Sequence, residues 1–436
     1  MVINKGVKRL IAASASMALA SMLLVSPAQA ASPLKATDFY NPLKILRIDL
    51  QLPQLTVNAL NNRNTYKTYQ PGAVTMSVDG RSSGTLDMEI RLKGSTSISK
   101  LSETPSFKIL FPKGPAETGY LGHRRLTLNA MTQDGSKVHE YGAYALFNAM
   151  GLPASKTGWA RVYVNDVYRG LYLNVEQPDE RFMAKKFKDI TQHIYEGVAL
   201  RDLKTGNADG DNLTGSFPAD FGWKVTPNKN DLTKLISVVT NYTSPAKWYT
   251  NLNTVLDRTA LIKFMAVENF LSHWDGYSGP LVNNYFIRSS TSGKFTIIPW
   301  GLDQTFGEIR KTDAISDTFF APLLSKTSIH PWMDPEVQTT RGSLYVKCIA
   351  YSTCRTAYLT ELKAVSDMAT KMKLSTLMKN ASTLIKNALT DQSRIYPYNK
   401  SSNWMARIAP EQTRTLTFIA SRQYQVAALV KQYKIK

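Results

Sequence analysis

Two short stretches in the second half of the chain combine the polar residue types that phosphoryl transfer requires. The first, HWDGYSGPLVNNYFIR (273–288), contains Asp275 and the neighbouring Asn283 and Asn284, and the second, FTIIPWGLDQTFG (295–307), contains Asp303. An Asp beside an acceptor hydroxyl orients it and takes its proton, whereas an Asn and a second Asp hold the magnesium that bridges the phosphates. In the alternative interpretation these side chains only satisfy turns and loop caps, as Asp and Asn often do.

Charged residues in the first half supply candidates for contacting a nucleotide. The segment from Arg91 through Lys93-Gly94 to Ser97 joins a strand to a polar loop, and Lys108 lies in the next strand. Such a loop can donate backbone N–H groups to phosphate, and a strand Lys can supply a point charge. We therefore take Arg91, Lys108, Glu140 and Glu176 as candidate nucleotide-binding residues, with Glu140 as a partner for Lys108 and Glu176 at a hinge. The alternative is that they are ordinary solvated charges.

The elements that must position these residues differ between the two halves of the chain. Alternation of apolar and polar residues predicts strands in the first half, at 44–50, 74–78, 86–92, 107–111, 124–128, 159–164 and 168–175. Asp79-Gly80 and Asn165-Asp166 are typical of tight hairpin turns. Helical spacing predicts one helix over 136–150, with Ser136 as its cap.

The second half is predicted to be mainly helical. Apolar residues recur at helical spacing over 232–239 and 261–271, with Asp257 as a cap, and in three stretches after 357. One hairpin, 282–288 with 294–300, interrupts the helices and brings the Asn pair and Asp303 to one end. We predict an α+β fold with the layout of a two-lobed, protein-kinase-like protein, in which residues 31–197 form a β-rich lobe and residues 198–436 a mainly α lobe.

Composition indicates a globular, exported protein. The 436 residues are 43% hydrophobic and 20% charged, which excludes collagen, low-complexity disorder and a bundle of membrane spans. Residues 1–30 have the features of a secretory signal peptide: basic residues up to Arg9, an apolar run to Val25 and the small-residue site Ala28-Gln29-Ala30. We expect a periplasmic, cell-surface or secreted protein whose mature chain has no transmembrane span.

The strong positive charge limits the choice of partners. Removing the three cations of the signal peptide, which carries no anion, lowers the net charge from +20 to +17. Such a chain can associate with an anionic cell-envelope polymer. Nucleic acid is not expected, because the cations are scattered, no nucleic-acid-binding motif occurs, and the chain is exported.

The two cysteines are expected to form a local disulfide. Cys348 and Cys354 lie six residues apart in CIAYSTC, and an exported chain meets an oxidising environment. A zinc site is not expected, because the histidines form no HExxH or other ligand spacing.

Several motifs in a fixed order resemble the spore coat protein H (CotH) kinase family over roughly residues 40 to 360. They are RLKGSTS, PSFKILF, GLPAS, VYVNDVYRGLYLNVEQPDERF, HWDGYS, NNYF and PWGLDQTFG. The resemblance implies an atypical, exported protein kinase that binds ATP and Mg²⁺ or Mn²⁺ and phosphorylates Ser or Thr hydroxyls of surface or extracellular proteins. It also implies Asp275 as the catalytic Asp, Asp303 with an Asn of the NN pair as metal ligands, and Lys108 on phosphate.

The chain departs from the family pattern at one position. Many members have a second Asp where this chain has Gly301, in WGLD. If that position holds the metal, this chain is impaired or inactive. The alternatives are therefore a surface assembly or polyanion-binding protein on the same fold, or a kinase for a carbohydrate or another small hydroxyl compound.

Overall fold

The computed structural model describes residues 31–94, 98–113, 119–187, 194–197, 202–203, 229–279, 282–307, 341–395 and 404–436. The predicted signal peptide and residues 95–97 of the RLKGSTS loop lie outside these ranges. The described part of the chain contains no helix long and apolar enough to cross a membrane.

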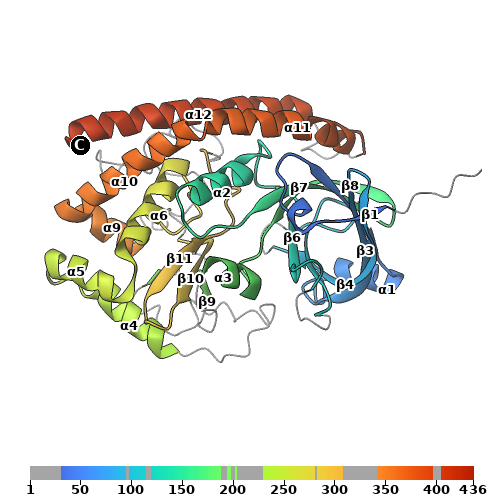
Figure 1. Ribbon diagram of the computed structural model, residues 1–436, viewed down its shortest axis with the longest axis horizontal. Coiled ribbons are helices and arrows are strands. Elements are labelled where there is room, and N and C mark those ends of the chain that lie inside the picture. The colour runs from blue at the N-terminus through green and yellow to red at the C-terminus, as the bar shows by residue number, and fades with distance from the viewer. Residues whose placement is uncertain are drawn as a thin grey trace, which may run out of the picture.

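The strands of the first half form one closed sheet (Figure 1). They are β1 (Ser32–Pro33), β2 (Ile45–Gln51), β3 (Gln70–Val78), β4 (Arg81–Lys93), β5 (Ser106–Leu110), β6 (Arg125–Asn129), β7 (Thr157–Val164) and β8 (Val167–Val175). Their order is β1-β4-β3-β2-β7-β8-β6-β5, and a further β4–β5 pairing closes the sheet into a barrel. Both predicted hairpin turns are confirmed, since Asp79, Gly80, Asn165 and Asp166 all have positive φ.

Alternation along the strands separates an apolar face of the sheet from a polar one. The side chains of the apolar face form one buried cluster that includes Ile90, Leu92, Phe107, Ile109, Leu126 and Leu128. The intervening positions of β4, β5 and β6 carry charged and polar side chains, because successive residues of a strand point to opposite faces. This polar face includes Arg91, Lys93, Lys108, Thr127 and Asn129.

Short helices accompany the barrel. They are η1 (Ala36–Asp38), α1 (Gln54–Asn61), α2 (His139–Ala149) and α3 (Glu180–Lys186). The prediction that Ser136 caps α2 is wrong, since the helix begins at His139. The Asp134 carboxylate accepts hydrogen bonds from the backbone N–H groups of Ser136, Lys137 and His139 and so holds the loop that leads into the helix.

The second half contains a small sheet and most of the helices. The sheet has the order β11-β10-β9, formed by β9 (Ile194–Glu196), β10 (Tyr285–Ser289) and β11 (Phe295–Pro299). The helices are α4 (Lys229–Thr240), α5 (Pro245–Val255), α6 (Arg258–Leu271), α9 (Ser343–Ala350), α10 (Ser352–Lys371), α11 (Leu374–Ile395) and α12 (Trp404–Gln432). The predicted cap of α6 is confirmed, because the Asp257 carboxylate accepts a hydrogen bond from Ala260 N.

Contacts join the two halves across the predicted boundary at residue 197. β9, from the predicted first lobe, pairs with β10. Helices α11 and α12 extend over α2 toward the barrel (Figure 1), where Leu171 N of β8 donates to Gln392 Oε1 and Tyr168 Oη donates to the carbonyl of Ala388. The predicted α+β class is confirmed, whereas the two-lobed, kinase-like arrangement stays a prediction.

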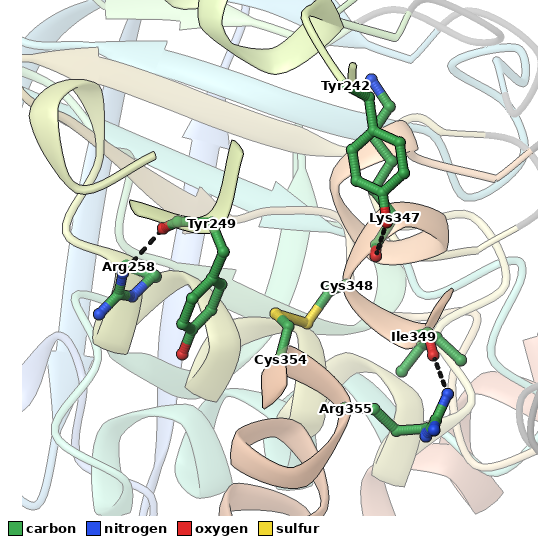
Figure 2. The surroundings of a disulfide bond; sticks show 8 residues. All are labelled: Tyr242, Tyr249, Arg258, Lys347, Cys348, Ile349, Cys354 and Arg355. Carbon is green, nitrogen blue, oxygen red and sulfur yellow. Dashed lines mark hydrogen bonds between the residues drawn. A yellow bond between two sulfur atoms is a disulfide. The ribbon is translucent and has the colours of Figure 1, made fainter. Parts of the chain in front are cut away.

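The predicted disulfide is present and links two consecutive helices. Cys348 in α9 and Cys354 in α10 are both buried, with their Cα atoms 4.9 Å apart. Figure 2 shows the bond surrounded by side chains that hold neighbouring backbone carbonyls, such as Tyr242 on Lys347 and Arg355 on Ile349. The bond therefore fixes the α9–α10 corner.

Candidate active site

The loop after α6 has a backbone conformation fixed by buried polar groups. Ser272 ends the helix with φ 54°, and the Glu268 carboxylate then accepts hydrogen bonds from Tyr277 N and Ser278 N. A Cβ at Gly276 would collide with the Glu268 carboxylate and the His273 ring, so the turn requires glycine. Asp275 lies inside this turn.

Asp275 is buried and held by three side-chain amides. Its Oδ1 accepts from Asn283 Nδ2 (3.1 Å), and its Oδ2 accepts from Asn284 Nδ2 (2.6 Å) and Gln304 Nε2 (3.3 Å). A carboxylate offers about four acceptor positions, so one remains for another donor. Burial raises the pKa of Asp275 to about 6, although the charge of His273 and the bond from Asn283 oppose the rise.

The end of the β10–β11 hairpin places both Asn residues beside Asp275. Trp300 N donates to the carbonyl of Asn284 (3.2 Å), and the His273 ring donates from Nε2 to the carbonyl of Gly301 (3.2 Å). Gly301 has φ 58°, and a Cβ there would lie 2.7 Å from the Asn284 amide. The Asn284 side chain thus takes the space beside residue 301, and the structure places both Asn amides on Asp275.

Asp303 follows β11 in a loop anchored to α6, where Phe306 N donates to the carbonyl of Leu271 (2.6 Å). Its side chain is only 8% exposed. In contrast to Asp275, the carboxyl of Asp303 accepts no hydrogen bond from another side chain among the described residues; its donor is its own backbone N–H. Burial raises its pKa, and the nearby charge of Lys93 opposes the rise.

Glu140 lies in the first turn of α2, against the same loop. The ring of His139, the preceding residue, packs on Phe306 with centroids 5.3 Å apart. Glu140 is 3% exposed and accepts a hydrogen bond from Asn129 Nδ2 (2.6 Å). Burial raises its pKa to about 8; the Asp303 carboxyl adds to the rise, and the charge of Lys93 opposes it. The two carboxyls therefore lie close enough to interact electrostatically.

The cations of the polar barrel face lie on neighbouring strands. Arg91 and Lys108 are directly opposite in the β4–β5 register, and Thr127 is opposite Lys108 on β6. Lys93 is two residues beyond Arg91, and its Nζ lies 6.0 Å from the centre of the Trp300 ring. The pairing of Lys108 with Glu140 stays a prediction, and the charge of Lys93 lowers the pKa of both Glu140 and Asp303.

Glu176 lies at the end of β8 in a basic environment. Its Oε1 accepts from Lys185 Nζ (3.1 Å) and its Oε2 from the backbone N–H of Lys156 (3.2 Å). The next residue, Gln177, accepts a hydrogen bond from Thr127 on the polar face (3.0 Å). Glu176 thus links the end of β8 to α3. Its role in nucleotide binding stays a prediction.

Sequence reasoning missed Lys93 and Gln304 as site residues. Lys93 shares strand parity with Arg91, which predicts that both point to one face of β4. Gln304 directly follows Asp303, but its contact with Asp275 requires the hairpin to turn the 303–306 loop back toward α6. The place of Lys93 could be predicted from the alternation along its strand, whereas the contact of Gln304 with Asp275 depends on the tertiary fold.

The residues fit a magnesium site that is completed by phosphate and water oxygens better than a metal site formed by protein ligands alone. Among the described residues, no group of three or more His, Cys, Asp or Glu side chains is arranged to hold a metal. Mg²⁺ is usually bound by one or two carboxylates, with phosphate and water oxygens completing the octahedron. Asp303, a buried carboxyl to which no other side chain of the described residues donates, is the kind of oxygen ligand that such an ion takes.

Comparison with known proteins identifies the family of the chain. The chain is 26% identical over 200 residues to inner spore coat protein H of Bacillus subtilis (strain 168), covering 43% of this chain and 51% of that protein. It is also 26% identical over 208 residues to invasin CotH2 of Rhizopus delemar, covering 44% of this chain and 33% of that protein. The matched segments thus span about half and a third of these relatives. The sequence model of the family described as CotH kinase protein matches residues 90–425, most of the chain, which therefore belongs to the CotH kinase family.

Proposed function

We propose that this chain is a metal-dependent kinase that transfers the γ-phosphoryl group of ATP to a Ser or Thr hydroxyl of another protein. The observation that carries this proposal is the pairing of two buried carboxyls with opposite surroundings, at one end of the β10–β11 hairpin. Asp275 is oriented by three side-chain amides, whereas Asp303 accepts no hydrogen bond from another side chain of the described residues. Phosphoryl transfer needs one carboxylate for the acceptor hydroxyl and another for the metal.

In this proposal Asp275 acts on the acceptor hydroxyl. The amides of Asn283, Asn284 and Gln304 hold its carboxylate in one orientation and leave one acceptor position for the hydroxyl proton. A pKa of about 6 keeps most of Asp275 ionised at neutral pH while leaving it a better base than an exposed Asp.

The nucleotide phosphates belong on the opposite side, between Asp303 and the polar barrel face. Asp303 would hold the divalent ion, which neutralises phosphate charge when bound, with the amide oxygens of Asn283 or Asn284 as further candidate ligands. Lys108 and Arg91 would supply positive charge to the phosphates from the polar face that also carries Thr127, and Glu176 would lie at the hinge beyond it.

Export and the acceptor class belong to the same proposal. The signal-like residues 1–30 and the disulfide of Cys348 and Cys354 support an oxidising, extracytoplasmic location. One relative is named a spore coat protein and the other an invasin. Those names support an acceptor among surface or extracellular proteins.

A second candidate function is that of a surface assembly protein that binds an anionic polymer without catalysis. The observations that favour it are the net charge of +17 left after residues 1–30 and the absence of a side chain at Gly301. Binding of this kind is expected to be diffuse and to weaken steeply with salt.

The two functions are separated by one assay on the chain from residue 31 onward. The chain is incubated with radiolabelled ATP, with and without Mg²⁺ or Mn²⁺, and incorporation into the chain and into added envelope proteins is measured. A kinase gives metal-dependent label on Ser or Thr that the Asp275→Asn variant loses. Absence of label together with absence of metal-dependent ATP binding would favour the assembly protein.

A further inference from the structure

One face of α12 contacts three elements of the candidate site. The face consists of Thr415, Phe418 and Arg422, which are three and four residues apart and therefore lie on the same side of the helix. All three are buried, and Arg422 is only 1% exposed. A helix at the end of the chain therefore packs behind the candidate site.

Thr415 and Phe418 contact the start of α2 and the loop after β11. Thr415 Oγ1 donates to the carbonyl of Glu411 (2.8 Å), so it accepts from Nε2 of His139 (2.7 Å), the first residue of α2. The Phe418 ring packs edge-on against Phe306, with centroids 6.0 Å apart. These contacts fix both elements against α12.

Arg422 contacts the end of α6. Its Nη2 donates to Ser272 Oγ (2.5 Å), its Nη1 donates to Gln425 Oε1 (3.1 Å), and its guanidinium lies 4.8 Å from the centre of the Phe418 ring. Ser272 ends α6 with φ 54°, and the turn with Asp275 begins directly after it. Because a left-handed backbone is unfavourable for residues other than glycine, the bond to the Ser272 side chain helps to hold this conformation.

The charge of Arg422 suits this position. The C-terminal end of a helix carries partial negative charge on its free carbonyls, and a cation there is stabilising. A buried guanidinium also requires acceptors for its donors, because loss of hydration is costly. A shift of the turn would take one acceptor, Ser272 Oγ, away from Arg422, so the buried arginine opposes such a shift.

We propose that Arg422 is a positioning residue for phosphate transfer, because it holds the end of α6 and with it the turn that carries Asp275. The acceptor hydroxyl must meet this carboxylate at a fixed distance and direction, and a misplacement of about 1 Å can cost about 100-fold in rate. The effect of Arg422 on transfer rests on the proposed function, whereas its effect on the turn does not.

Hydrogen exchange followed by mass spectrometry tests the effect on the turn. The backbone N–H groups of Tyr277 and Ser278 donate to the Glu268 carboxylate, and in Arg422→Met they should exchange at least about tenfold faster than in wild type. Exchange within α6 itself should change by less than about twofold. Unchanged exchange of the turn in the folded variant overturns the inference.

The kinetic test separates positioning from a general loss of stability. Arg422→Met should lower kcat for transfer by about 10- to 100-fold and change the metal-dependent affinity for ATP by less than about twofold. Arg422→Lys, which keeps a charged donor, should recover at least about threefold of the loss in kcat. A purely structural role would reduce transfer and ATP binding together, in proportion to the folded fraction, and that result contradicts the inference.

Ser272→Ala breaks the same bond from the other side, and it decides the question alone if Arg422→Met does not fold. It should reproduce the faster exchange of the turn and the lower kcat. Because both residues act through one bond, the double variant should lose no more than the larger single loss, and additive losses overturn the inference. The control is Arg414→Met on the same helix, where an exposed Arg414 pairs with Glu411 (3.0 Å); it should behave as wild type.

The two measurements distinguish this inference from the kinase proposal. A wild-type chain that transfers no phosphate overturns the kinase, and faster exchange of the turn in Arg422→Met then still supports the hold of Arg422 on the turn. Transfer by wild type, together with unchanged exchange of the turn in Arg422→Met and Ser272→Ala, supports the kinase and overturns the inference.

Discussion

Asp275 and Asp303 are the same residue type with similar burial, yet the hydrogen-bond donors around their carboxyls differ. Asn283 and Asn284 at the start of the hairpin and Gln304 of the 303–306 loop supply three side-chain amides to Asp275, whereas no other side chain of the described residues donates to Asp303, whose donor is its own backbone N–H. Both pKa values are raised by burial. Burial alone therefore does not distinguish the roles of the two carboxyls; the distribution of donors does.

Replacing Asp275 should have the largest effect on activity and little effect on binding. Asp275→Asn removes the proton acceptor, so phosphate transfer should fall by about 10²- to 10⁴-fold, the usual contribution of general-base catalysis. Metal-dependent ATP binding, measured by calorimetry, should change less than about twofold, since the loss is confined to the transition state. Loss of ATP binding in this variant would mean that the two carboxyls do not have separate roles.

The pH dependence of transfer tests whether the amides tune Asp275. Because its pKa is raised to about 6, the rate at saturating nucleotide should fall as pH drops through about 6, when the carboxylate becomes protonated. Asn283→Ala removes a hydrogen bond to the ionised form, so this acidic limb should move to higher pH. A limb at the same pH in both proteins would show that another group titrates.

Replacing a cation on the polar barrel face should weaken nucleotide binding, on the side of Asp303, and should not affect the action of Asp275 on the acceptor hydroxyl. If Lys108 contacts phosphate, Lys108→Ala should cost about 1.5 to 3 kcal/mol of nucleotide binding, the range for hydrogen bonds to charged groups. Lys113→Ala, at an exposed lysine shortly after β5, should cost less than about 0.5 kcal/mol of nucleotide binding. Lys93 is unsuitable as a control, because its charge acts on Glu140 and Asp303.

Equal losses at Lys108 and Lys113 that also grow as salt falls would point to a diffuse polyanion-binding surface. That outcome would favour the assembly protein over the kinase.

The disulfide should have the smallest effect on the site. It closes a loop with a sequence separation of 6, for which the chain-entropy description gives about 2 kcal/mol of stability. Replacing both cysteines by Ser should lower the melting temperature modestly and leave Mn²⁺ and ATP affinities unchanged. A change in affinity would mean that the α9–α10 corner is coupled to the site.

The local parts of the fold could be predicted because they depend on a few adjacent residues. Asn165-Asp166 tolerate positive φ and so specify their hairpin, and Asp257 caps α6 through a donor three residues away. The three-residue strand β9 was not predicted, since it is too short to show a periodicity and depends on pairing with β10. The start of α2 was misplaced because the Asp134 carboxylate, rather than Ser136, organises the loop before it.

The candidate site was predictable in its residue types but not in its contacts. The motifs around Asp275 and Asp303 indicated two carboxylates near the hairpin, and strand alternation indicated the cations of β4 and β5. That the charge of Lys93 acts on Glu140 depends on where α2 packs, and that Gln304 donates to Asp275 depends on the loop after β11. No periodic pattern in the sequence predicts either contact.

The position of α11 has a consequence for how fast ligands can exchange. Its Gln392 and Ala388 are hydrogen-bonded to β8, so the helical part is fastened to the barrel at a point separate from the small sheet. Swinging the barrel away as a rigid body would break these bonds and expose part of the core around α2. Entry and departure of a nucleotide should therefore be limited by side-chain and loop motion, and hydrogen exchange at Leu171 should be equally slow in the free and nucleotide-bound protein.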